Sequence, residues 1–217
     1  EHQYFHTAFP APVSLTTAEH DFWEISSTGT TTAVAPSNGL LRGVSVNTGT
    51  SATGCGDVAS KEQFVSLNTV DGTASWGYVK TKIVTPSSLS NGTQDYTLRV
   101  GFLAGECGSD LAEGAYFYYN HAINSGAWSC YTQNAGNIQN NNSGTTVAAS
   151  TIYTLEVVYR PNISVEFFIN GTRVATNDTH IPEGDNMKVV CEIEKQGGTT
   201  QRDLQVYLLQ TSIAHVN

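Results

Sequence analysis

Short runs that alternate apolar and polar residues recur along this chain, and they constrain its fold more than any other feature. In the segment 164–170, Val165, Phe167 and Ile169 share one face while Glu166 lies on the other. Because successive side chains of a β-strand point to opposite faces, such runs predict strands with one buried face. Helix signals are poor, since the one candidate, Ser109–Gly114, is short and bounded by glycine.

The same pattern predicts about thirteen strands, separated by Gly, Asn, Ser and Pro clusters. They are Gln3–Phe9, Phe22–Ser26, Leu40–Asn47, Glu62–Val70, Trp76–Val84, Tyr96–Leu103, Ala115–His121, Trp128–Gln133, Tyr153–Arg160, Ser164–Asn170, Thr172–Thr176, Lys188–Lys195 and Asp203–Ser212. The dipeptide Asn170-Gly171 predicts a tight type I′ hairpin, because both residues tolerate positive φ. The polar stretch Asn134–Thr146 is expected to be an exposed loop. Without a charge run or a Pro-rich linker, the pattern favours one all-β, two-sheet antiparallel sandwich over residues 1–217, in which residues 1–40 are an edge strand or an N-terminal arm.

Composition excludes several classes of protein. Ten Lys+Arg against nineteen Asp+Glu give a net charge of −9, whereas binding to nucleic-acid phosphates needs clustered positive charge. The apolar runs, such as Val157–Tyr159, are only a few residues long and too short to span a bilayer. The chain is 39% hydrophobic and only 13% charged, which argues against disorder. A chain that begins at Glu1 is expected to be processed or excised from a longer one.

Four cysteines leave the redox chemistry open at this stage. Cys55, Cys107, Cys130 and Cys191 are too far apart in sequence for a zinc-knuckle pattern. Two disulfides in any of three pairings would suit an extracellular surface, and four buried thiols are the alternative. Five Asn-x-Ser/Thr sequons matter only if the chain passes through a secretory pathway; they begin at Asn91, Asn141, Asn162, Asn170 and Asn177.

A series of motifs between Ser75 and Ser212 resembles a known family. The motifs are Trp76-Gly77-Tyr78, Leu98–Leu103, Gly114–Tyr119, Gly126–Cys130, Tyr153–Val157, Val165–Gly171, His180–Pro182 and Leu204–Tyr207. Their order resembles the concanavalin A-like jelly-roll domain of phage and other viral tail fibres, tailspikes and head fibres. The resemblance implies a two-sheet jelly roll that acts as a glycan- or receptor-facing surface module and assembles as a homotrimer. The cysteines and the acidic loop 106–113 are not expected features of that family.

On this resemblance, the chain is expected on a virion surface, in an extracellular setting, as a fibre, spike or capsid decoration for host attachment. Its expected partners are a host-surface glycan or receptor and neighbouring viral structural subunits, with no nucleic acid and no membrane insertion. A trimer would convert weak single-site contacts into avidity. Two alternatives stay open: a virion-borne polysaccharide hydrolase or lyase on the same fold, and a structural protein that joins capsid subunits.

The segment Ala115–Gln133 is rich in aromatic rings and amides. Sugars stack their C–H faces on aromatic rings, while amide groups satisfy their hydroxyls. Alternation places Phe117 toward the core and its two neighbours on the opposite face. The predicted glycan-binding residues are Tyr116, Tyr118, Asn120, His121, Trp128 and Tyr131. The alternative is that these rings fill the interior of the sandwich.

No catalytic residue is assigned. A retaining glycosidase needs two carboxylates about 5 Å apart, and Glu192-Ile193-Glu194 places two acids on one side of a strand without a third acid nearby. A lyase would need Arg, His and Tyr on one face, and the six histidines are scattered singly. The sequence therefore favours binding over catalysis.

No metal site or cofactor is assigned either. Glu106, Asp110 and Glu113 form an oxygen-rich loop that could hold calcium. The loop lacks the regular ligand spacing of a calcium-binding loop, so a solvated acidic surface is the favoured interpretation.

Overall fold

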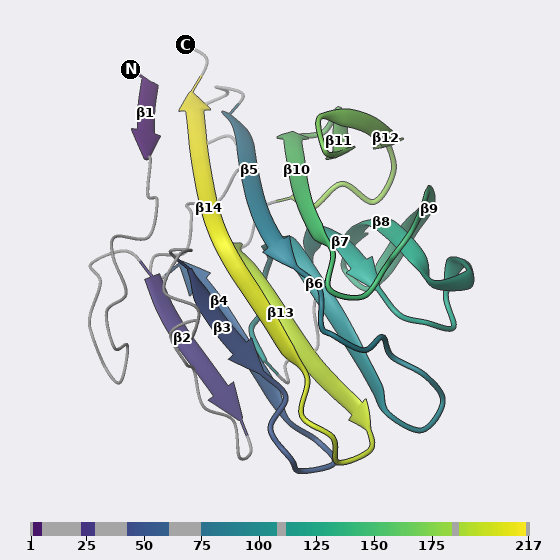
Figure 1. Cartoon of the computed structure of the whole chain (residues 1–217). Coiled ribbons are helices and arrows are strands. Elements are labelled where there is room, and N and C mark those ends of the chain that lie inside the picture. The colour runs from purple at the N-terminus through teal and green to yellow at the C-terminus, as the bar shows by residue number, and fades with distance from the viewer. Residues whose placement is uncertain are drawn as a thin grey trace.

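The chain folds into two seven-stranded antiparallel sheets (Figure 1). The computed structural model describes residues 2–5, 23–28, 43–60, 75–107, 112–183 and 187–215. The predicted strand Glu62–Val70 lies outside these residues. Within them, no helix is long and apolar enough to cross a membrane.

One sheet, here called sheet A, has the order β1-β14-β5-β10-β11-β12, with β3 also beside β14. Strand β3 pairs with residues 203–206 of β14, and β1 pairs with residues 211–214 farther along the same edge. The strands of sheet A are β1 (His2–Phe5), β3 (Val44–Asn47), β5 (Ser75–Val84), β10 (Ile152–Arg160), β11 (Ser164–Ile169), β12 (Thr172–Asn177) and β14 (Asp203–His215).

The second sheet, sheet B, has the order β2-β4-β13-β6-β7-β8-β9. A single 3₁₀ turn, Asn124–Gly126, precedes β8 and is the one helical element among the described residues. The strands of sheet B are β2 (Trp23–Thr28), β4 (Cys55–Ser60), β6 (Asp95–Leu103), β7 (Gly114–Tyr119), β8 (Ala127–Asn134), β9 (Asn137–Thr146) and β13 (Lys188–Gly197).

The core lies between the inner faces of the two sheets, where the apolar positions of the alternating strands meet. Phe117 of β7 contacts Phe167 of β11 edge-to-face at 5.3 Å between ring centroids. Phe102 of β6 packs against Tyr159 of β10 at 6.4 Å. All four rings are at most 1% exposed, and burying a side chain of this size stabilises the fold by about 1.5–3 kcal/mol. This packing confirms the predicted all-β antiparallel sandwich.

The predicted hairpin at Asn170-Gly171 is also confirmed. It joins β11 to β12, and its residues have φ angles of 51° and 80°. Both values are positive, as a type I′ turn requires.

The prediction of an exposed loop over Asn134–Thr146 is wrong, because most of this stretch forms β9 at the edge of sheet B. Two of its inward side chains, Gln139 and Asn141, are amides where an apolar group would be expected. Asn141 Nδ2 donates to Oδ1 of Asn177 at 2.9 Å, and Gln139 Oε1 accepts from the Thr179 amide at 2.8 Å. These bonds join β9 to the end of β12, so hydrogen bonds with a distant segment hold this strand in place of apolar burial.

Candidate functional site on the outer face of sheet B

The outer face of sheet B, which points away from the core, gathers most of the chain's unusual side chains. Alternation in β7 sends Phe117 and Tyr119 into the core and turns Tyr116 and Tyr118 outward. Tyr131 of the neighbouring strand β8 points to the same side. Besides these tyrosines, the face carries Asp57, Arg99, Gln133, Asn140, Glu192 and Glu194, from β4, β6, β8, β9 and β13.

Three tyrosines form an aromatic cluster at the centre of this face. The ring of Tyr131 stacks on Tyr116 at 5.6 Å and lies 5.1 Å from Tyr118. The Tyr116 hydroxyl donates to Gln133 Oε1 at 3.1 Å, and the Tyr131 hydroxyl accepts from Asn140 Nδ2 at 3.3 Å. Tyr116 and Tyr131 are nearly buried, whereas Tyr118 is partly exposed. The cluster therefore presents one ring to solvent on a support that is already held in place.

Trp128 does not belong to this cluster, and its prediction as a glycan-binding residue is wrong. Its side chain is 0% exposed and lies in the core between the sheets. The indole packs against the rings of Tyr153 at 5.7 Å, Phe117 at 6.1 Å and Tyr119 at 6.2 Å. Alternation along β8 sends Trp128 to the face opposite Tyr131, so a sugar on the outer face could not touch it.

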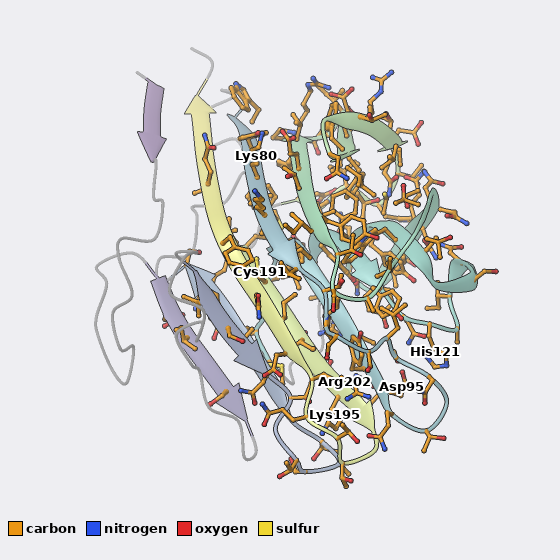
Figure 2. The ribbon with its side chains drawn as sticks, in the orientation of Figure 1. Lys80, Asp95, His121, Cys191, Lys195 and Arg202 are labelled. Carbon is orange, nitrogen blue, oxygen red and sulfur yellow. A yellow bond between two sulfur atoms is a disulfide. The ribbon has the colours of Figure 1, made fainter. Side chains whose placement is uncertain are left out.

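Asn120 and His121 follow the end of β7 and lie at the rim of the face. Burial raises the pKa of Tyr118, and a side-chain hydrogen bond from Asn120 offsets part of that rise. His121 Nδ1 lies 3.1 Å from Asp95 Oδ1 and 3.2 Å from Ser90 Oγ. His121 and Asp95 are labelled in Figure 2. The structure thus places Asn120 beside the tyrosines and directs the ring of His121 to Asp95 and to the loop before β6.

Arg99 is the functional candidate that the sequence analysis missed. It lies on β6 between the tyrosine cluster and β13, and its guanidinium contacts Glu192 at 2.7 Å and Glu194 at 3.3 Å. The one signal in the sequence is a single charge among the core residues Leu98 and Val100. The ionic cluster Arg99–Glu192–Glu194 therefore adjoins the three tyrosines on one surface.

Glu192 is the buried member of this ionic cluster. Its side chain is 1% exposed, against 22% for Glu194. Burial raises the pKa of Glu192 to about 7, and it outweighs the lowering effect of Arg99; the nearby carboxylates of Glu194 and Asp57 raise the pKa further. A carboxyl group in this state is protonated in weakly acidic solution.

This pKa predicts an unusual dependence of stability on pH. The folded chain holds the Glu192 proton up to about pH 7, while the ordinary value is 4.5. The folded state then binds more protons than the unfolded state, so the contribution is present below pH 4.5 and is lost as the pH rises through 7. We expect the free energy of unfolding to fall by roughly 2–3 kcal/mol between pH 5 and pH 8 from this group.

Urea unfolding of the wild type and of Glu192→Gln at these two pH values measures this effect. The Gln variant should lose most of the fall. Glu166→Gln on sheet A is the matched control, because a hydrogen bond from Arg173 lowers the pKa of Glu166 and keeps its titration below this range. Equal falls in the wild type and Glu192→Gln would contradict the assignment.

A disulfide between Cys55 and Cys107 borders the site on the β4 side. It ties the segment after β6 to β4, and the Cys107 amide donates to Asp57 Oδ2 at 3.2 Å. The other two cysteines, Cys130 and Cys191, are buried thiols. The structure thus has one bridge and two core thiols, which is neither of the two alternatives left open by the sequence.

One acidic residue of the loop 106–113, Glu106, forms an ion pair with Lys188. Lys188 Nζ contacts Glu24 at 2.6 Å and also contacts Glu106. Asp110 lies outside the described residues, and the expectation that this loop is a solvated acidic surface without an assigned metal stays a prediction. Among the sequons, Asn177 is 0% exposed and donates to the Cys130 carbonyl at 3.0 Å, so it cannot carry a glycan in the folded chain.

Comparison with known proteins identifies the family of this chain. Residues 42–206 match the family described as SO2946-like, C-terminal domain. The chain belongs to this family. The comparison with curated proteins found no match.

Solved structures resemble the SO2946-like domain in fold. An endo-β-1,4-glucuronan lyase from the fungus Trichoderma reesei has a TM-score of 0.62 and 10% identity, covering 93% of each chain. An endo-1,3-β-glucanase from Streptomyces sioyaensis has a TM-score of 0.62 and 12% identity, covering 96% of this chain and 95% of the enzyme. The potassium-bound carbohydrate recognition domain of Emp46p has a TM-score of 0.58 and 9% identity, covering 95% and 98%. These likenesses confirm the concanavalin A-like jelly roll expected from the sequence.

Proposed function

We propose that this chain is a carbohydrate-binding module whose glycan lies on the outer face of sheet B, with Tyr118 as its stacking ring. The observation that carries the proposal is the tyrosine cluster, in which two nearly buried rings hold a partly exposed third. An aromatic ring already fixed in orientation loses little entropy when a sugar stacks on it. Amides for the hydroxyls of the sugar lie at the cluster, with Asn120 hydrogen-bonded to Tyr118 and Asn140 to the neighbouring Tyr131.

The names of two proteins with a similar fold support a carbohydrate ligand. The Emp46p domain is a carbohydrate recognition domain, and the Trichoderma reesei protein is a glucuronan lyase. The virion surface, the homotrimer and the viral partner subunits are part of this proposal, and they rest on the resemblance to fibre and spike domains. The mass of the purified chain in solution tests the trimer.

Polysaccharide cleavage is the second candidate, because Arg99, Glu192 and Glu194 adjoin Tyr118 on the same face. Double-carboxylate hydrolysis requires that both acids reach the scissile bond. Of the two, only the Glu194 side chain is partly exposed, while that of Glu192 is covered. The geometry therefore favours binding over hydrolysis by this pair.

A glycan array followed by calorimetry on the best ligand tests the proposal. Tyr118→Ala should weaken binding by about tenfold, which corresponds to about 1.4 kcal/mol of lost stacking. Tyr78→Ala is the matched control, since Tyr78 is a half-buried tyrosine on the outer face of sheet A. It should bind like the wild type.

Two outcomes would argue against a module of this kind. Equal affinity of Tyr118→Ala and the wild type would remove the tyrosine cluster as the binding surface. New reducing ends or unsaturated products from the bound polymer, abolished by Glu194→Gln, would assign the face to cleavage instead.

A further inference from the structure

Three potential metal-binding atoms converge beside the ionic cluster, and each comes from a different part of the chain. The sulfur atoms of Cys55 and Cys107 and a carboxylate oxygen of Glu192 all lie within 4.8 Å of one another. Cys55 begins β4, Cys107 follows β6, and Glu192 is on β13. The register brings Cys55 opposite Glu194 and Asp57 opposite Glu192 across the same pair of strands. The backbone of the two paired strands therefore holds two of the three side chains at a set separation.

A second observation at this place points to a missing ligand. Glu192 Oε2 is buried and has no hydrogen-bond partner among the described residues, whereas Oε1 accepts from Arg99 at 2.7 Å. A buried carboxyl oxygen without a partner is costly whether or not it carries the proton, because it loses its hydration and gains no bond in return. A cation held by the two sulfur atoms and the Glu192 carboxylate would give this carboxylate a second partner besides Arg99.

We propose that, when its disulfide is reduced, this chain binds a thiophilic divalent cation, with zinc as the expected ion, through Cys55, Cys107 and Glu192. Zinc takes thiolate and carboxylate ligands, usually in a tetrahedron. Three protein ligands leave its fourth position for water or for another group. Asp57, which is 0% exposed and whose carboxylate holds the Cys107 amide, lies next to the three ligands and supports the loop that carries Cys107.

Disulfide and metal are mutually exclusive at this site. In the oxidised chain the two sulfur atoms are bonded to each other and offer no thiolate. A phosphine reductant and one water molecule convert the bridge to two thiols, and the phosphine leaves as its oxide with the oxygen of that water. The metal then replaces the two thiol protons and any proton held by Glu192, all of which are released to solvent, so that affinity rises with pH.

The other two cysteines provide an internal contrast. Cys130 and Cys191 are both 0% exposed in the core, on β8 and β13. Within the described residues, Cys55, Cys107 and Glu192 are the one group of three His, Cys, Asp or Glu side chains close enough to share an ion. If the metal bound to any free thiol, Cys130 and Cys191 would serve as well as Cys55 and Cys107. The proposed site instead requires Cys55 and Cys107, because only these two lie beside Glu192.

Titration of the whole chain with Co²⁺, a spectroscopic substitute for Zn²⁺, tests the proposal. After phosphine treatment, the wild type should bind one Co²⁺ per chain with a thiolate-to-metal charge-transfer band, and Zn²⁺ should displace it. The untreated, oxidised wild type is the first control, because it has the same sequence and should give no band. Zn²⁺ should also raise the Tm of the reduced chain and leave that of the oxidised chain unchanged.

Variants separate the three ligands from the remaining thiols. Glu192→Gln should weaken Co²⁺ binding at least about tenfold, since even residues one shell behind a ligand typically cost 10–100-fold. Cys55→Ser with Cys107→Ser should abolish the band, and Cys130→Ala with Cys191→Ala should keep it. No band in the reduced wild type, a band that survives loss of Cys55 and Cys107, or wild-type affinity in Glu192→Gln would each overturn the site. If the Cys55 and Cys107 double variant does not fold, the oxidised and reduced wild type still decide the result.

Discussion

Replacement of Trp128 by alanine is expected to lower the free energy of unfolding by about 4 kcal/mol, near the middle of the range for large aromatic core residues. The indole is 0% exposed and contacts the rings of Phe117, Tyr119 and Tyr153. Removing it leaves a cavity at the place where β7, β8 and β10 meet. The surrounding strands are tied by their hydrogen-bond ladders, so they can collapse into that cavity only in part.

Urea unfolding of Trp128→Ala at one pH measures this loss. Tyr118→Ala is the matched control, because Tyr118 lies on the outer face of the same sheet and is partly exposed. We expect that control to lose less than half as much stability while losing glycan affinity. A folded Trp128→Ala with wild-type stability would mean that the ring is not a core residue.

Removal of the Cys55–Cys107 disulfide is expected to cost about 4 kcal/mol of stability, by the loop-closure entropy of the unfolded chain. The bridge spans a sequence separation of 52 residues. Without it, the unfolded chain gains conformations, and we expect the folded chain to gain few, because the Asp57 contact and the strand register do not depend on the bridge being closed.

Unfolding of the oxidised and phosphine-reduced chain, in metal-free buffer, measures this difference. The same comparison in Cys130→Ala with Cys191→Ala should give the same loss, because those thiols form no bridge. A difference below about 1 kcal/mol would show that the 52-residue separation is already restricted in the unfolded state.

Local pattern was sufficient for much of the fold. The alternation in β10 and β11 predicted which side chains are buried, and the Asn170-Gly171 turn followed from backbone chemistry alone. These features depend on a residue and its near neighbours in sequence. The pairing of Tyr116 with Tyr118 on one face of β7 was predictable for the same reason.

Long-range packing decided the features that the pattern missed. Strand β9 has no apolar alternation, since its inward amides bond to Asn177 and Thr179 of a segment far along the chain. Arg99 becomes a functional candidate only because β13 pairs with β6, which places Glu192 and Glu194 beside its guanidinium. A contact between residues far apart in sequence leaves no repeating pattern in the sequence of either strand, so it cannot be predicted from that sequence.

Trp128 shows where the division lies. The alternation of a strand requires that Trp128 and Tyr131, which are three residues apart, point to opposite faces of β8, and the structure has them so. Only the tertiary structure decided which of those faces meets sheet A, and likewise which cysteines pair and which acid is buried. The physical reason is that a strand's periodicity specifies two faces relative to each other, while the choice between core and surface depends on what the rest of the chain packs against them.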